Sequence, residues 1–303
     1  MNEIKVDYLT KKYGKKVVLK DLNLTLTYPS ITGLIGRNGS GKTTLLNLLV
    51  GYKNPTCGKI KVFGENPFDS LFVSANTIFV DDRMQIPNTL NLNDILIEMG
   101  RFYPNWDSQL ATNLLNYFDL PPNSLHQNLS KGKKSVFNMI VGLSAYAFFT
   151  VFDEPMTGMD EAVRKDMYRA LLKNYLEKPR IMIISSHHLQ EVEYLLENLI
   201  LLDEGNLMFE GDIEAFRSYA IGLTGKTAVL EPWAQTKTIL HKEQVGIDDT
   251  YVVIKNDVSQ VELDLYSEKQ SRVETSDLLI YLTNKHRGVI DDVFKTDRIE
   301  SSK

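Results

Sequence analysis

The sequence predicts an α/β fold built around a mixed, mainly parallel sheet, and three observations lead to this prediction. Short apolar strands alternate with helical stretches as far as about residue 217 of the 303-residue chain, which is typical of helices packed on a parallel sheet. The apolar run 31–35 leads through a glycine-rich loop into the helical run 44–50, where Gly51 can end the helix. After about residue 218 the pattern changes, so we expect two domains, residues 1–217 and 218–303.

The first domain is expected to add an antiparallel edge and a helical insertion to this sheet. Residues 3–9, 21–27 and 59–63 alternate between apolar and polar side chains, as antiparallel strands with one exposed face do. About residues 92–147 are richer in helix and would form an insertion. Residues 181–184 read as a short buried strand. Residues 199–202 and 206–209 flank Asp203-Glu204-Gly205, which predicts a hairpin.

The second domain is predicted to be a small α+β appendage. Residues 250–254 and 261–265 have the composition of strands, and a helix is expected at about residues 277–285, with Thr275 and Ser276 as caps. Its sequence contains no glycine-rich loop, metal-ligand spacing or nucleophile constellation. We therefore expect the chemistry to lie in the first domain.

Composition and charge exclude several classes of function. A net charge of −5 argues against nonspecific nucleic-acid binding, which requires a basic surface. The single cysteine, Cys57, rules out an intrachain disulfide framework and fits a reducing compartment. The charge-free stretch 135–152 ends at Asp153 and contains polar residues, so it reads as a buried helix and strand rather than a membrane span. We expect a cytoplasmic protein without an apolar signal segment.

A complete phosphate-binding loop, G-x-x-x-x-G-K-[ST], stands between the first predicted buried strand and its helix. Its glycines let the backbone bring successive N–H groups up to phosphate oxygens, and the helix N-terminus adds partial positive charge. Lys42 would reach the β- and γ-phosphates, and the Thr43 hydroxyl would bind Mg²⁺. The predicted nucleotide-binding residues of this loop are Gly36, Arg37, Asn38, Gly39, Ser40, Gly41, Lys42, Thr43 and Thr44.

A second nucleotide element is the apolar strand 148–152, which ends in the carboxylate pair Asp153-Glu154. This matches the Walker B arrangement. Asp153 would hold Mg²⁺ through water, and Glu154 would polarise the water that attacks the γ-phosphate. The alternative is an ordinary solvated pair of carboxylates at a strand end.

The third element is Leu129-Ser130-Lys131-Gly132-Lys133, about 20 residues before Asp153. With this segment the chain closely resembles the ATP-binding-cassette (ABC) nucleotide-binding domains, whose signature is usually Leu-Ser-Gly-Gly-Gln. Ser130 and the Gly132 amide, at the start of a helix, would form an anion site. The resemblance implies that Ser130, Lys131 and Gly132 contact the γ-phosphate of an ATP held by a second ABC subunit.

The resemblance assigns three further positions. Tyr13 matches the aromatic residue that stacks on adenine, Asp160 lies in the loop after Walker B that meets the opposite subunit, and His187 matches the switch histidine that contacts the γ-phosphate. The neighbouring His188 is an alternative for the last role. A surface tyrosine and an exposed histidine are the alternatives for Tyr13 and His187.

One position departs from the family pattern. The family's glutamine, which touches Mg²⁺ and the attacking water, aligns with Asp82. An aspartate there would still approach Mg²⁺ through water, but it adds negative charge, so coupling and hydrolysis rate are expected to differ. We therefore count Thr43, Asp82 and Asp153 as the predicted metal-binding residues, and Glu154 and His187 as the catalytic ones.

The resemblance covers residues 3 to about 215 and implies an ATPase, with ATP and Mg²⁺ as cofactors, that works as a dimer. The expected partners are a second cassette and a separate transmembrane permease, which would hold the chain at the inner face of the membrane; nucleic acid is not expected. Export of peptides, drugs or lipids is favoured over import. A soluble cassette acting on ribosomes or DNA, and another phosphate-loop enzyme such as a kinase, are the remaining alternatives.

Overall fold

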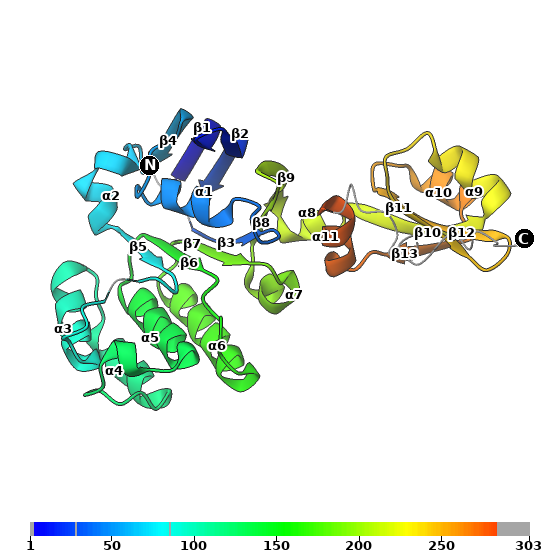
Figure 1. Cartoon of the computed structure of the whole chain (residues 1–303). Coiled ribbons are helices and arrows are strands. Elements are labelled where there is room, and N and C mark those ends of the chain that lie inside the picture. Colours follow the sequence, from blue (N-terminus) through cyan, green and yellow to red (C-terminus); the bar gives the residue numbers. More distant parts are fainter. Residues whose placement is uncertain (1–2, 28, 85, 284–303) are drawn as a thin grey trace, which may run out of the picture. The chain divides into compact units, whose positions relative to one another are not determined.

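The structure, a computed structural model, describes residues 3–27, 29–84 and 86–283. The chain folds into two compact units that divide between Phe216 and Arg217 (Figure 1). The following description treats each unit by itself.

Two sheets form the framework of the first unit. The antiparallel sheet has the strand order β2-β1-β4, with β1 at Glu3–Tyr13, β2 at Lys16–Thr27 and β4 at Cys57–Val62. The six-stranded sheet has the order β5-β6-β7-β3-β8-β9. Its strands are β3 (Ser30–Ile35), β5 (Thr77–Val80), β6 (Phe149–Asp153), β7 (Ile181–Ser186), β8 (Asn198–Asp203) and β9 (Asn206–Asp212). Only the β8–β9 pairing within it is antiparallel, so the predicted mixed, mainly parallel sheet is confirmed.

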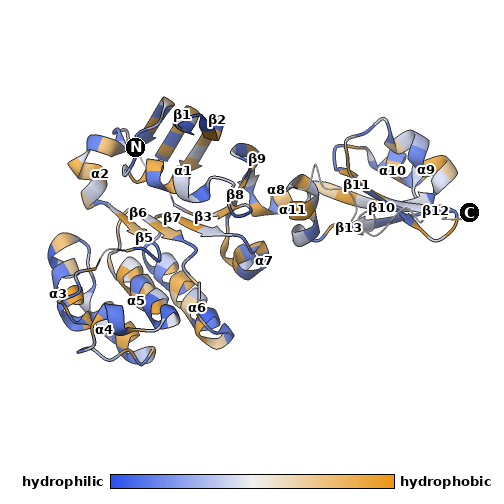
Figure 2. Cartoon of the chain, in the orientation of Figure 1, coloured by the Kyte–Doolittle hydropathy of each residue, from blue (hydrophilic) through white to orange (hydrophobic). Residues whose placement is uncertain are grey.

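The main core of the first unit lies around helix α1 (Lys42–Leu49). Its four leucines, at positions 45, 46, 48 and 49, are buried together with inward-facing residues of β1 and β2 on one side and of β3, β6 and β7 on the other. Every residue of β3 is buried, as expected for a central strand covered on both faces. Figure 2 shows the hydrophobic colouring of these central strands.

Helices cover the other side of the six-stranded sheet (Figure 1). The segment predicted to be a helical insertion contains α3 (Leu92–Phe102), α4 (Ser108–Tyr117) and α5 (Lys131–Ser144), and α6 (Glu161–Glu177) follows β6. Each begins at a side chain that accepts a backbone N–H: Asn91, Asp107, Ser130 and Asp160. The shorter helices are η1 (Pro67–Asp69), α2 (Leu71–Ala75), η2 (His126–Asn128), α7 (Leu189–Val192), η3 (Glu193–Leu195) and α8 (Ile213–Arg217).

The second unit contains a β-α-β-β-α-β succession. Its elements are β10 (Ala220–Lys226), α9 (Thr227–Ala234), β11 (Ile239–Val245), β12 (Asp249–Lys255), α10 (Gln260–Tyr266), β13 (Lys269–Arg272) and then α11 (Thr275–Thr283). The strand order is β11-β12-β10-β13, and all neighbours are antiparallel. This is the ferredoxin-like, split β-α-β arrangement. Residues 284–285 of the predicted last helix lie outside the described residues.

The predicted strand at residues 261–265 is wrong, because this segment is part of helix α10. The Ser259 side chain accepts the backbone N–H of Glu262 and starts the helix. Only Leu263 packs into the core, whereas Val261 and Leu265 are 77% and 68% exposed. The alternation of apolar and charged residues that suggested a strand therefore does not mark a buried face.

No helix in the described ranges is long and apolar enough to span a membrane. The charge-free stretch 135–152 divides between α5 and β6, as the sequence predicts.

A core substitution should separate the stabilities of the two units. Leu230 of α9 is fully buried against β10 and β12, so we expect Leu230→Ala to lower the free energy of unfolding of the second unit by about 2–5 kcal/mol. Urea unfolding can be followed by the fluorescence of Trp233, in the same core, in a Trp106→Phe background. The exposed Val261→Ala, on α10, is the control and should change this value by less than about 0.5 kcal/mol. An unchanged midpoint for Leu230→Ala would contradict the described core.

Candidate nucleotide-binding and catalytic site

The phosphate loop connects the end of β3 to the start of α1 in a conformation that glycine permits. Gly41, directly before the helix, has φ 108°, a value that residues with a side chain rarely adopt. At Gly36, a Cβ would stand 2.3 Å from the carbonyl oxygen of Leu202. From the β8–β9 turn, the Gly205 N–H donates to the Ser40 carbonyl at 3.0 Å. The predicted loop residues thus form one turn at the N-terminus of α1, and a hydrogen bond from the β8–β9 turn supports it.

Lys42 is held inside this loop. Its side chain is only 6% exposed, and Nζ donates to the carbonyl oxygen of Gly36 at 2.7 Å and to that of Arg37 at 3.4 Å. The same ammonium lies 3.4 Å from Oε1 of Glu154. A buried ammonium needs such partners, because loss of water is otherwise costly. The loop lysine and the Walker B glutamate are therefore in direct contact in this chain.

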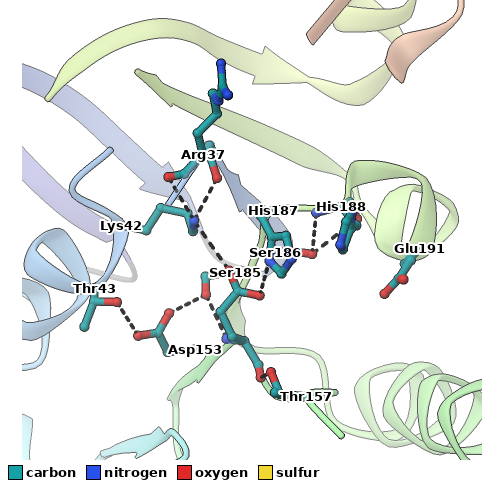
Figure 3. A network of polar contacts seen from close by, with 12 residues as sticks. Arg37, Lys42, Thr43, Asp153, Thr157, Ser185, Ser186, His187, His188 and Glu191 are labelled. Carbon is teal, nitrogen blue, oxygen red and sulfur yellow. Dashed lines mark hydrogen bonds and ion pairs between the residues drawn. The ribbon is translucent and has the colours of Figure 1, made fainter. Parts of the chain in front are cut away.

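Thr43 and Asp153 meet at the end of β6. The Thr43 hydroxyl donates to Oδ2 of Asp153 at 2.7 Å, and the Ser185 hydroxyl donates to Oδ1 of the same carboxylate (Figure 3). Asp153 is 7% exposed, so these bonds replace water around the buried carboxylate. Two of the three predicted metal-binding residues, Thr43 and Asp153, are thus in contact in the structure.

Glu154 connects the phosphate loop to His187. Oε2 of Glu154 lies 2.8 Å from Nδ1 of His187, while its Oε1 faces Lys42. The glutamate backbone has φ 49°, in the left-handed region. Its N–H donates to the Ser185 hydroxyl at 2.9 Å, and its carbonyl accepts the Thr157 hydroxyl at 2.9 Å. The surrounding contacts hold this residue in an unfavourable conformation, which is common at functional sites.

Of the two neighbouring histidines, His187 is the one that contacts Glu154. The His188 ring lies against the His187 ring with centroids 3.9 Å apart, and its backbone bonds to Ser186. The two rings and Glu154 border a pocket of about 190 Å³. The rest of its lining comes from Pro155, Met156, Thr157, Gly158, Arg164, Tyr168, Ile184, Ser185, Ser186, Glu191 and Val192.

The residues at this site suit a magnesium ion bound together with phosphate. Mg²⁺ prefers oxygen ligands and is usually bound by one or two carboxylates plus substrate phosphates. The Thr43 hydroxyl and Asp153 carboxylate supply such oxygens within 2.7 Å of each other. Among the described residues there is no group of three or more His, Cys, Asp and Glu side chains that would hold a metal on its own. The donor set therefore fits an ion that also needs a triphosphate.

Tyr13 lies at the end of β1 between two lysines. Its ring is 42% exposed, its hydroxyl accepts from Nζ of Lys53 at 3.0 Å, and the ammonium groups of Lys11 and Lys53 lie 5.3 and 5.0 Å from the ring centroid. Desolvation raises the pKa of the phenol, but the Lys53 hydrogen bond and charge, with Thr44 and Lys11, outweigh it and lower the pKa. The exposed ring thus lies beside Thr44 of the phosphate loop.

The signature residues lie apart from the phosphate loop in this chain. Ser130 caps α5, and its hydroxyl accepts the Lys133 N–H. Gly132 packs against the loop after Walker B, where a Cβ would come 2.3 Å from the Gly158 carbonyl oxygen. Asp160 caps α6 by accepting the Val163 N–H at 2.9 Å. Ser130 and Asp160 thus lie at the N-termini of α5 and α6, whereas residues 36–44 connect β3 to α1 and form its first turn.

Asp82, predicted as a metal-binding residue, lies at the surface. Its carboxylate is 61% exposed and stands 3.8 Å from Nε of Arg83. The preceding Asp81 follows β5 directly. Burial raises the pKa of Asp81, and although the Arg83 N–H bond opposes this, the charges of Asp82 and Asp153 raise it further.

One residue of the site, Ser185, was not identified from the sequence. Ser185 contacts both acidic residues of the Walker B pair. A signal for Ser185 was present, since two serines follow four apolar residues and Ser185 stands two residues before His187.

The fold and the site together define a phosphate-loop nucleotide hydrolase. The profile of the family described as "ABC transporter" matches residues 19–157. The chain is 30% identical over 212 residues to the bacitracin transport ATP-binding protein BcrA of Bacillus licheniformis, covering 68% of this chain and 69% of that protein. It belongs to the ATP-binding subunits of ABC transporters, a family of ATPases, and the resemblance expected from the signature is confirmed.

Two further comparisons agree with this assignment. The Nod factor export ATP-binding protein I of Rhizobium leguminosarum is 27% identical over 220 residues, which cover 71% of this chain and 70% of that protein. A solved dimeric structure of a bacterial ABC transporter cassette superposes with a TM-score of 0.61 at 21% identity, covering 69% of this chain and 98% of that one. The structural comparison shows that the fold is shared.

Loss of the loop ammonium should abolish useful nucleotide affinity. Lys42→Ala removes the cation expected to offset the triphosphate charge, so we expect ATP binding to weaken by about 100-fold or more. Titration with a fluorescent ATP analogue measures this. Lys165→Ala, which removes an exposed lysine paired with Glu161, is the matched control and should bind normally. Undiminished binding by Lys42→Ala would contradict the assignment of the loop.

Proposed function

We propose that this chain binds and hydrolyses Mg²⁺-ATP to drive export of peptides, drugs or lipids through a separate membrane permease. The observation that carries the catalytic part is the position of Glu154. Its carboxylate stands 3.4 Å from Lys42 of the phosphate loop and 2.8 Å from His187, next to the Asp153–Thr43 pair. A base, its orienting partner and the expected phosphate and metal ligands thus converge on the carboxyl ends of β3, β6 and β7.

In this proposal each residue has a defined task. Lys42 and the loop amides bind the β- and γ-phosphates, and Thr43 and Asp153 hold the metal. When bound, magnesium would neutralise the negative charge that develops on the phosphate oxygens. Glu154 accepts a proton from the attacking water, and the oxygen of that water forms a bond to the γ-phosphorus. The bond from that phosphorus to the β–γ bridging oxygen breaks, which yields ADP and phosphate.

His187 is assigned the role of orienting the base. Its Nδ1 lies within hydrogen-bond distance of the Glu154 carboxylate, which restricts that side chain to one direction. Tyr13 is assigned to the adenine, and an aromatic–base stack contributes about 1–3 kcal/mol. Asp82, exposed and paired with Arg83, is assigned to coupling with the permease rather than to the metal.

A second cassette is part of the proposal. Ser130, Lys131 and Asp160 are exposed at two helix N-termini, where backbone N–H groups and the helix dipole favour anions. A solved cassette with the same fold is described as dimeric. We therefore infer that these residues complete the nucleotide site of a partner cassette, either a second copy or a related chain, at the inner face of the membrane.

Replacing the base should separate ATP binding from hydrolysis. We expect Glu154→Gln to lower kcat by about 10²–10⁴-fold, the usual contribution of a general base, while ATP affinity changes by less than about threefold. Phosphate release and equilibrium ATP binding are the two measurements. Glu161→Gln, an exposed carboxylate of α6, serves as the control. A Glu154→Gln variant with wild-type turnover would require another base.

The direction of transport can be tested in vesicles that carry the permease with this chain on the outer side. External ATP then energises only these complexes, so an exporter should move a labelled peptide or lipid into the lumen. An importer would instead release a substrate loaded inside. We expect ATP-dependent uptake that is lost with Glu154→Gln. Release without uptake would contradict the proposed direction, and the absence of any permease that copurifies with the chain would contradict the transport role.

A further inference from the structure

Ser185 links the two acidic residues of the catalytic site. It is the second-last residue of β7 and is fully buried. In the parallel pairing of β6 with β7 it stands opposite Asp153. Its hydroxyl donates to Oδ1 of Asp153 (Figure 3). The same hydroxyl accepts the N–H of Glu154 at 2.9 Å. One side-chain oxygen therefore contacts both the expected metal-binding carboxylate and the backbone of the expected base.

The bond to Asp153 fixes the direction of its carboxylate. Oδ1 accepts from Ser185, and Oδ2 accepts from Thr43 at 2.7 Å. These two hydroxyls come from β7 and α1, on different sides of the strand end. Rotation of the carboxylate would break one bond or the other. With Oδ1 occupied, Oδ2 is the oxygen that remains directed toward the phosphate loop.

The bond to Glu154 supports an unfavourable backbone. Glu154 has φ 49°, which is uncommon for a residue with a side chain. Its N–H is the first beyond β6 and is bound by the Ser185 hydroxyl, while Thr157 binds its carbonyl. This conformation aims the side chain at Lys42 and His187. Removal of the hydroxyl would leave a backbone N–H without its partner where the chain turns sharply.

The apolar composition of β7 also supports a specific role for the Ser185 hydroxyl. Residues 181–184 of this strand are apolar and fully covered, as a central parallel strand requires. A hydroxyl in such a place is costly to bury unless it is hydrogen-bonded. At Ser185 both bonds go to residues of the site. Outer-shell groups of this kind orient metal ligands and commonly affect metal affinity and activity together.

We propose that Ser185 is a positioning residue for ATP hydrolysis, whose hydroxyl holds the carboxylate of Asp153 and the backbone of Glu154 in one arrangement. The inference deepens the proposed function and rests on it. Ser185 need not touch the nucleotide, because it acts through its two neighbours. Its loss should therefore affect turnover and the dependence on magnesium more than the binding of ATP itself.

The test compares Ser185→Ala with Ser144→Ala in the full chain. Ser144 is also fully buried, and its hydroxyl has no hydrogen-bond partner in the described part of the chain. For Ser185→Ala we expect kcat to fall about 10- to 100-fold and half-maximal activity to require several-fold more Mg²⁺. ATP affinity measured without Mg²⁺ should change by less than about twofold. Ser144→Ala should match the wild type in all three measurements.

Two further variants keep the test decisive. Ser185→Thr retains the hydroxyl and should recover most of the activity. Ser185→Cys nearly preserves the volume but offers only a weak donor, so it should behave like alanine even if the alanine variant folds poorly. Wild-type turnover and Mg²⁺ dependence in both the alanine and the cysteine variants would overturn the role of Ser185. A loss of Mg²⁺-free ATP binding as large as the loss of turnover would also overturn it, since that indicates a merely structural role.

The outcome also separates this inference from the one on which it rests. A wild-type chain without Mg²⁺-dependent ATP hydrolysis, alone or with its permease, would overturn the proposed function. An active wild type with unaffected Ser185 variants would overturn only the positioning role.

Discussion

The side-by-side pairing of parallel strands is the constraint on which the site depends. β6 pairs with β7 so that Asp153 stands opposite Ser185, and β7 pairs with β3 so that Ser186 stands opposite Ile35. Parallel strands end at the same edge of a sheet, and ligands bind in the crevice outside those ends. The phosphate loop, the Walker B pair and His187 follow three different strands and reach the same place because of this register.

The buried charged groups at this edge of the sheet each have polar or charged partners. The ammonium of Lys42 lies between loop carbonyls and Glu154, and the carboxylate of Asp153 lies between two hydroxyls. Each group thus has partners before a nucleotide arrives, which avoids the cost of an unpaired buried ion. Binding a triphosphate requires Lys42 to exchange neutral carbonyls and a carboxylate for phosphate oxygens.

The part of the site encoded in contiguous residues was predictable from the sequence. The loop at residues 36–44, the pair Asp153-Glu154 and the histidine after β7 each carry their chemistry in a short motif, and the structure brings them together. The role of Ser185 could not be predicted, because it depends on which residue of β6 stands opposite it in the sheet. The exposure of Asp82 could not be predicted, because the direction of a side chain in the loop after β5 is decided by tertiary contacts. In the second unit, residues 261–265 alternate like a strand, yet the Ser259 cap and the single inward residue Leu263 make them a helix.

The single cysteine of the sequence, Cys57, is free and exposed at the start of β4, in the antiparallel sheet. A thiol-reactive dye or spin label therefore attaches at one place without any engineered substitution. In an assembly of two copies, the pair of labels would report a single separation between subunits. A change in that separation on addition of nucleotide would show whether the two copies move relative to each other.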